Sequence, residues 1–193
     1  MPGFTRYMKI PELFYSDATK QKFQFCIECN NYLLNSGKFY VIEKAVRNYK
    51  KFNTRDTLFE YALCMDCEEA IWDTISKSSA EKLEEYYSGN IDYERRLRRY
   101  EKLETRDLHL MTSRCLIKDI SIDETDEYIL VAFCQDEYII VHYAPYMICG
   151  EAMDEVGQLL SNKTIEIMDD FVGRNLGIPP EFEVKDKPRL ILA

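Results

Sequence analysis

Two Cys-x-x-Cys pairs are the residues in this sequence best suited to chemistry. Cys26 and Cys29 form the first pair, and Cys64 and Cys67 form the second. Four thiolates are the ligand set of a tetrahedral structural zinc site, with Zn–S distances of about 2.3 Å. Such a shell is closed and leaves no open coordination position for catalysis. We therefore expect one zinc ion that stabilises the fold and takes no part in a reaction.

The same thiols also allow an iron–sulfur centre, a redox dithiol or four reduced cysteines without metal. A redox dithiol fits less well, because a thioredoxin-like motif is one Cys-x-x-Cys in a βαβ context. Seven cysteines, four of them in such pairs, favour metal binding in a reducing compartment over a disulfide framework. The first residues lack the apolar stretch of a secretory signal. We therefore expect a cytoplasmic protein.

The segments around the cysteines must form elements that bring the two pairs together. Aromatic and β-branched residues over 39–42 indicate a strand, with a return strand over 57–63. The second cysteine pair then lies at the start of a helix over 68–76. Capping-box spacing at Ser78 predicts the start of a second helix. The expected order is a cysteine turn, a hairpin, a second cysteine turn and two helices.

The second half of the chain shows the same predicted order. Dense apolar and β-branched residues over 128–133 and 138–143 indicate two strands. Apolar residues at helical spacing predict helices over 151–160 and 163–174. A further helix over 91–110 is expected to connect the two halves.

An internal repeat accounts for this similarity. Residues 61–71 and 143–153 are identical at six of eleven positions when shifted by 82. The following helix matches at a shift of 85, as with Leu83 and Met168, which we interpret as a three-residue insertion between the helices. The duplication is the firmest inference that the sequence allows.

The second copy has lost half of its ligands in this alignment. Cys115 matches the first cysteine of the first pair, and Cys149 matches the last ligand, Cys67. The other two ligand positions hold Lys118 and Tyr146, which are poor ligands for zinc. We therefore expect no metal in the second copy, with its two cysteines close together.

A cysteine turn, a hairpin and a second pair at a helix N-terminus is the order found in treble-clef zinc fingers. Over residues 22–90 the chain resembles that group. The resemblance implies structural zinc ligands at Cys26, Cys29, Cys64 and Cys67. It also implies an α+β fold built from two treble-clef-like units joined by a helix. The expected divisions are a zinc unit (1–90), a connecting helix (91–110), a metal-free copy (111–175) and a tail (176–193).

Charge is distributed unevenly along the chain, and this limits where a polyanion could bind. The net charge is −9. Residues 1–118 hold 20 basic and 18 acidic side chains, whereas residues 119–193 hold 5 and 16. Nucleic acid could therefore contact only the first half. The candidate is the hairpin 38–56, in which aromatic residues alternate with basic ones. Its proposed contacts are Lys44, Arg47, Lys50, Lys51 and Arg55.

A thiol enzyme is a second alternative. It would use Cys149 or Cys134 as nucleophile with His142 as base. A histidine on a half-buried strand is more often a structural residue, and the sequence holds no phosphate loop, dinucleotide fingerprint or Ser-His-Asp signature.

The sequence therefore predicts a non-catalytic, zinc-stabilised module that binds another protein. Its 14 tyrosines suit such a surface, because tyrosine is enriched at interfaces. No apolar run approaches the ~20 residues needed to cross a bilayer, so we expect no membrane partner.

Overall fold

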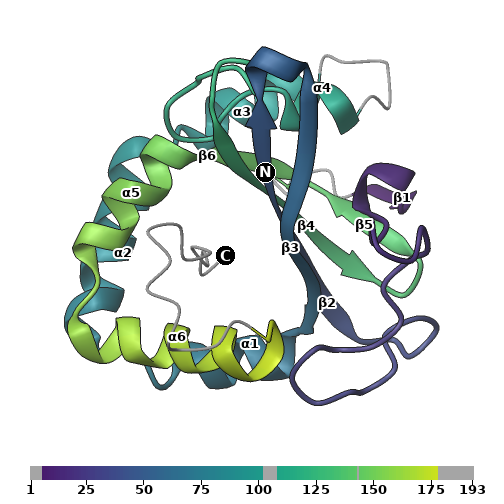
Figure 1. Ribbon diagram of the computed structural model, residues 1–193, viewed down its shortest axis with the longest axis horizontal. Coiled ribbons are helices and arrows are strands. Elements are labelled where there is room, and N and C mark those ends of the chain that lie inside the picture. The colour runs from purple at the N-terminus through teal and green to yellow at the C-terminus, as the bar shows by residue number, and fades with distance from the viewer. Residues whose placement is uncertain (1–5, 102–107, 143, 178–193) are drawn as a thin grey trace.

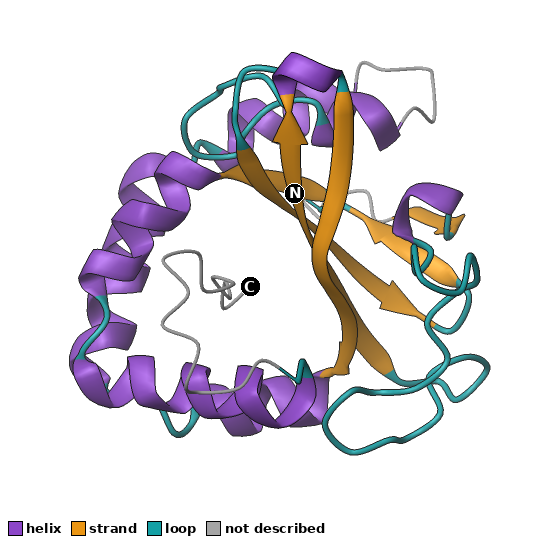
Figure 2. Ribbon diagram, viewed as in Figure 1, coloured by secondary structure: helices purple, strands orange, loops and turns teal. Residues whose placement is uncertain are grey.

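The computed structural model describes residues 6–101, 108–142 and 144–177. The fold mixes helices and strands, as the sequence predicts. One six-stranded sheet forms one wall of the molecule, and four of the six α-helices described form an arc that faces it (Figures 1 and 2). The other two α-helices lie at one end of the sheet (Figure 1).

The elements follow the expected order along the chain. The strands are β1 (Arg6–Lys9), β2 (Phe39–Tyr49), β3 (Thr54–Cys64), β4 (Glu127–Gln135), β5 (Tyr138–Val141) and β6 (Tyr146–Cys149). The α-helices are α1 (Met65–Trp72), α2 (Lys77–Asn90), α3 (Tyr93–Glu101), α4 (Leu108–Thr112), α5 (Gly150–Leu159) and α6 (Asn162–Asn175). Two short 3₁₀ helices are η1 (Glu12–Phe14) and η2 (Lys50–Phe52).

The two halves of the chain share this sheet. Its order is β1-β5-β4-β2-β3, and β6 also pairs with β4. The central antiparallel pair joins β2 of the first half to β4 of the second over nine residue pairs. One continuous apolar core contains buried side chains from both halves. A substitution that disturbs the packing of either half therefore affects a core that both halves share.

The predicted return strand over 138–143 is shorter than expected, and a separate strand follows it. β5 ends at Val141, and β6 begins at Tyr146 after a cis peptide bond between Ala144 and Pro145. β5 pairs with β1 on its other side. The N-terminal segment thus completes the sheet edge beside the second half of the chain.

Helix positions differ from the sequence prediction in some details. The helix predicted over 68–76 is α1, which begins earlier at Met65 and ends at Trp72, with Cys64 as its N-cap. α2 begins at Lys77, close to the predicted start near Ser78, but its N-cap is Ser76, whose hydroxyl accepts the N–H of Ser79. Of the predicted connector over 91–110, the described parts are α3 and α4, and residues 102–107 lie outside the description. Most of the predicted tail lies outside it as well.

Candidate metal centre

Three elements bring the four predicted ligands together. Cys26 and Cys29 lie in a tight turn before β2, closed by the Asn30 N–H donating to the Cys26 carbonyl at 2.9 Å. Asn30 has a φ of 57°, which asparagine tolerates better than most residues. Cys64 is the last residue of β3 and the N-cap of α1, and Cys67 lies in the first turn of that helix.

The four Sγ atoms lie within 4.8 Å of one another. The Cys29 and Cys64 sulfurs are 3.7 Å apart. A tetrahedron with metal–sulfur bonds of about 2.3 Å has edges of about 3.8 Å, so this separation suits two ligands of one ion. The four cysteines can therefore hold a single metal ion.

Hydrogen bonds favour the thiolate form that a metal requires at Cys29, whereas burial raises the pKa of Cys64 and of Cys67. The Cys64 N–H points at the Cys26 sulfur at 3.4 Å. Burial raises the pKa of Cys29, but hydrogen bonds from the Asn31 backbone and from the other cysteines outweigh this effect and lower it overall. A bound metal ion would favour the thiolate form further, because it binds the deprotonated sulfur.

The turn between the first two cysteines is tied to the last helix of the chain. The Arg174 guanidinium donates to Glu28 Oε1 at 2.9 Å, and the Asn175 amide donates to Glu28 Oε2 at 2.6 Å. Both donors lie at the C-terminal end of α6. The position of α6 is thus coupled to the candidate metal turn.

The segment around Cys115 forms a second turn with matching geometry. The Asp119 N–H donates to the Cys115 carbonyl at 3.0 Å, and Asp119 has a φ of 55°. The Cys149 N–H points at the Cys115 sulfur at 3.3 Å. Each turn also pairs with the strand before the helix, through Ile27 to Ala62 in one case and Leu116 to Met147 in the other.

These contacts correct the predicted alignment of the second half. Cys149 ends β6 and caps α5, so it occupies the place of Cys64 and not that of Cys67. The shift is therefore 85 both here and in the next helix, and the proposed insertion between the helices is wrong. The place of Cys67 is taken by Ala152 in the first turn of α5, and Tyr146 stands at no ligand position.

An ion pair links the second turn to its helix. Lys118 stands where Cys29 stands in the first turn, and its ammonium group is 2.5 Å from Glu155 of α5. The Tyr86 hydroxyl donates to the other oxygen of Glu155 at 2.7 Å. Among the described residues, only the first four cysteines form a group of ligand side chains close enough to hold one metal ion.

Two of the three cysteines of the second half, Cys115 and Cys149, interact with each other. The Cys149 thiol and three backbone N–H groups lower the pKa of Cys115 to about 6. Hydrogen bonding to Cys115 and burial raise the pKa of Cys149. Burial also raises the pKa of Cys134. Since Cys149 and Cys134 are fully buried, neither has the exposed, low-pKa thiol of a nucleophile, and nothing here supports their use with His142.

The predicted nucleic-acid contacts are largely occupied by carboxylates. Lys44 is only 3% exposed and pairs with Asp17 and Glu60 beneath the N-terminal segment. Three others pair with acidic residues of the loop before β4 or of its first position, and within the described part of the chain Lys51 is the one of the five whose side chain makes no ion pair or hydrogen bond. Those pairs are Arg47 with Glu127, Lys50 with Asp126, and Arg55 with Asp123. The acidic second half thus neutralises most of the basic side chains that the alternative, nucleic-acid-binding hypothesis assigned to phosphate contacts.

A buried carboxyl group on the helical side of the sheet escaped the sequence analysis. Glu43 of β2 is fully buried and accepts a 2.5 Å hydrogen bond from the Tyr61 hydroxyl. The Tyr61 ring packs edge-on against Phe171 of α6. Burial raises the pKa of Glu43 to about 8, with a further contribution from Glu68. A polar residue within an apolar strand run was the only signal in the sequence.

The chain matches no protein-family model, no curated protein and no solved structure. Function must therefore be argued from the geometry of this molecule. Within the described residues, no helix is long and apolar enough to cross a membrane.

Proposed function

We propose that this chain is a non-catalytic module that is stabilised by one zinc ion and binds another protein. The convergence of four thiols from a turn, a strand end and a helix start carries this proposal. Sulfurs within 4.8 Å of one another suit one ion, whereas a polynuclear iron–sulfur cluster needs room for several atoms between them. A four-thiolate shell is closed, so the metal supports the fold and does no chemistry.

Elemental analysis of the purified chain tests the metal. We expect one zinc per chain, and none in the Cys67→Ser variant. The control is Cys134→Ser, because Cys134 is buried away from the cluster and hydrogen-bonds to the Ala132 carbonyl. Iron in place of zinc would refute the identity of the ion. Absence of any metal after purification without chelators would refute the site.

An exposed aromatic pair beside the metal turn supports the binding of a protein. Phe25 and Tyr32 flank the turn, face each other across an isolated β-bridge and pack edge-to-face with centroids 5.6 Å apart. They are 50% and 47% exposed. Aromatic side chains held on a rigid support are typical anchors of protein interfaces. A filled metal site would provide that support.

The matched test replaces the aromatic pair without touching the ligands. A partner enriched from native extract is purified, and its affinity is measured for the parent chain, for Phe25→Ala with Tyr32→Ala, and for Phe52→Ala. Phe52 is 77% exposed at the far end of the β2–β3 hairpin. We expect the double variant to lose at least about tenfold in affinity (~1.4 kcal/mol), with Phe52→Ala unchanged. Equal loss in both, or in neither, would contradict the assigned surface.

We further infer that the second half is a metal-free copy of the treble-clef-like zinc unit. The matched turns around Cys26 and Cys115 support this inference, as do the matched thiol contacts of Cys64 and Cys149. In the copy, the ion pair of Lys118 with Glu155 replaces the metal as the link between turn and helix. The two units are proposed to span residues 1–90 and 111–175.

A further inference from the structure

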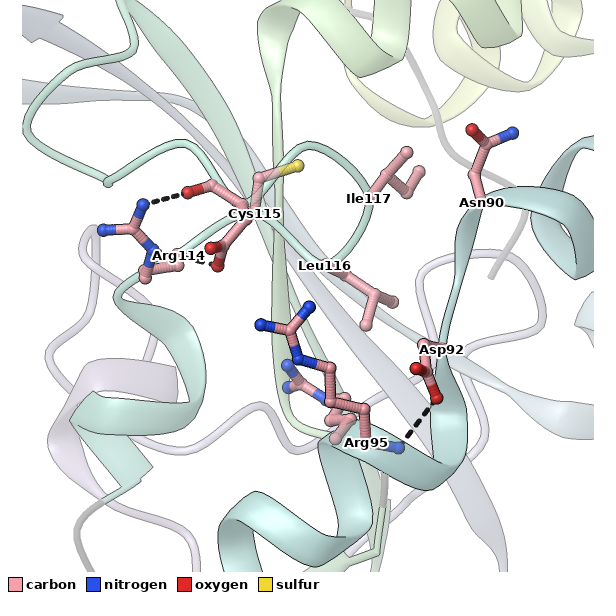
Figure 3. A pocket seen from close by; sticks show the side chains of 9 residues that line it. Asn90, Asp92, Arg95, Arg114, Cys115, Leu116 and Ile117 are labelled. Atoms are coloured by element: carbon pink, nitrogen blue, oxygen red, sulfur yellow. Dashed lines mark hydrogen bonds and ion pairs between the residues drawn. The ribbon is translucent and has the colours of Figure 1, made fainter.

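A pocket lies where the second cysteine turn faces the α2–α3 junction (Figure 3). Its volume is about 140 Å³. A cavity needs roughly 10–15 Å³ on this measure to hold one water, so the space exceeds that of an isolated hydration site. The lining residues are Asn90, Asp92, Arg95, Arg96, Arg114, Cys115, Leu116, Ile117 and Asp119.

Comparison with the first cysteine turn explains why this space is open. There, Arg174 and Asn175 at the end of α6 bind Glu28 and close the gap. At the end of α2 the corresponding residues are Gly89 and Asn90, and the turn carries Ile117 in place of Glu28. A Cβ built on Gly89 would meet no atom within 4 Å. The second turn has thus lost the bridge that fills the first.

The pocket offers guanidinium groups to an anion. Three of them line it, against two carboxylates and the Cys115 thiol, whose pKa is lowered to about 6. Asp119 is engaged by the Nε of Arg114 at 2.9 Å, and Asp92 accepts the backbone N–H of Arg95 at 2.8 Å. The Arg96 guanidinium is held by the Met111 and Pro145 carbonyls. The pocket therefore places guanidinium donors at the surface of a chain whose net charge is −9, where they can attract a small anion.

Arg95 provides the group available for recognition. Among the described residues, its guanidinium has no hydrogen bond or ion pair, whereas Arg96 and Arg114 are both engaged. Figure 3 shows its side chain extending from the start of α3 toward the cysteine turn. A guanidinium offers a planar set of donors that matches a carboxylate or a phosphate. Leu116 and Ile117 supply an apolar surface beside it.

We propose that this pocket binds a small organic anion, with its carboxylate or phosphate on Arg95 and a short apolar body against Leu116 and Ile117. The proposal is independent of the identity of the metal, because no residue of the four-cysteine cluster lines the pocket.

Titration of the full chain with three probes tests the proposal. Phenyl phosphate and benzoate carry the anion on an apolar ring, and inorganic phosphate carries the anion alone. Binding is followed by calorimetry and by amide chemical shifts at constant ionic strength, with chloride as the balancing anion. We expect saturable binding of at least one ring-bearing probe, more tightly than inorganic phosphate. The choice between phosphate and carboxylate follows from which of the two binds better.

Matched arginine variants decide whether Arg95 is the anchor. Since a hydrogen bond to a charged group is worth more than a neutral one, we expect Arg95→Gln to weaken binding at least about tenfold. The control is Arg98→Gln, because Arg98 lies outside the pocket and pairs with Glu94 on the same helix. The proposal is overturned if no probe saturates, if Arg95→Gln binds like the parent chain, or if Arg98→Gln loses as much.

Discussion

The hydroxyl groups of Ser76 and Ser161 are hydrogen-bonded to each other at 2.8 Å. Ser76 caps α2 and Ser161 caps α6, so the N-termini of the last helix of each half meet at this point. The contacts are reciprocal, because the Ser76 N–H donates to Thr164 and the Ser161 N–H donates to Ser79. Each helix start is therefore completed by a residue from the other half.

The centre of the sheet shows the same reciprocity. Tyr40 pairs with Cys64 in the first half, and Tyr128 pairs with Cys149 in the second. This register makes Val131 the counterpart of Glu43, and these two residues face each other directly in the β2–β4 pair. The two halves thus meet at matching positions both in the sheet and at the helix caps. We interpret this as an internal two-fold arrangement of the proposed copies.

The paired caps should show energetic coupling. Ser76→Ala and Ser161→Ala are each expected to destabilise the protein by about 1 kcal/mol through loss of an N-cap. Because the two hydroxyl groups also hydrogen-bond to each other, the double variant should be destabilised by at least ~0.5 kcal/mol less than the sum of the two single variants. Urea unfolding of the four proteins of the cycle measures this difference.

An exposed serine on the same helix provides the control. Ser88→Ala removes a hydroxyl that bonds only within α2, and its effect should stay within ~0.5 kcal/mol. Strict additivity of the two cap substitutions would show that the two hydroxyls act independently, against a shared capping network.

The sequence predicted the clustering of the four cysteines and the order of elements well, because both depend on local patterns. Four thiols in two short motifs specify a cluster almost without reference to the fold. The hairpin strands follow from dense β-branched and aromatic residues. The shift of 82 was misleading, because chance identities around Cys149 outnumbered the structural equivalence, which rests on strand ends and backbone contacts.

The sequence did not predict which residues far apart along the chain contact each other. Lys44 was expected on an exposed hairpin, but strand alternation places it beneath the N-terminal segment, where its ammonium donates to the Tyr15 carbonyl. Arg47 and Arg55 meet carboxylates about 70–80 residues away in sequence. No local pattern reports which acidic segment will fold beside a basic one. The buried Glu43 was missed for the same reason, since its partner Tyr61 lies on another strand.

Loss of the metal should destabilise the whole chain and not only its first half, because β2 and β4 belong to one sheet. Cys64→Ser is expected to abolish metal binding and lower the unfolding temperature by more than about 10 °C, which corresponds to several kcal/mol for a chain of this size. A strong chelator should do the same to the parent chain. Differential scanning calorimetry should then show one shifted transition.

Cys149→Ser is the matched comparison, since Cys149 holds the equivalent place in the second half. It should retain the metal and cost only about 1–2 kcal/mol. An equal loss of metal or stability in both variants would mean that the second half is also a metal site.

Glu43 should make the stability of the protein fall as pH rises. Its pKa is about 8 in the folded chain, against an ordinary value of 4.5. Between these two values the folded state holds a proton that the unfolded state has released, so stability declines from about pH 4.5 to about pH 8. Glu43→Gln keeps a neutral acceptor for Tyr61 and should remove this decline, which can amount to several kcal/mol.

The comparison is best made between pH 6 and 9, where acid does not protonate the cysteine ligands. The difference in unfolding free energy between Glu43→Gln and the parent chain should grow as the pH rises to about 8 and level off above it. Glu81→Gln, an exposed change on α2, should leave the parent profile unchanged. A constant difference across this range would show that Glu43 is already ionised in the folded protein.

Restoring the missing thiols tests the proposed copy most directly. Lys118 follows Cys115 by three residues, as Cys29 follows Cys26, and Ala152 follows Cys149 by three residues. Lys118→Cys combined with Ala152→Cys should therefore complete a second four-thiolate shell. We expect two zinc ions per chain in place of one. Cobalt substitution should double the charge-transfer absorption of tetrahedral thiolate sites.

The single variant Lys118→Cys is the control, because it breaks the ion pair with Glu155 but leaves the second shell one ligand short. It should be less stable than the parent chain and bind the second metal weakly, since three thiols leave a position for water. The double variant should recover stability only when the metal is added. If it folds and still holds one ion per chain, the second turn is not a former metal site, and the match between the two halves is one of backbone geometry alone.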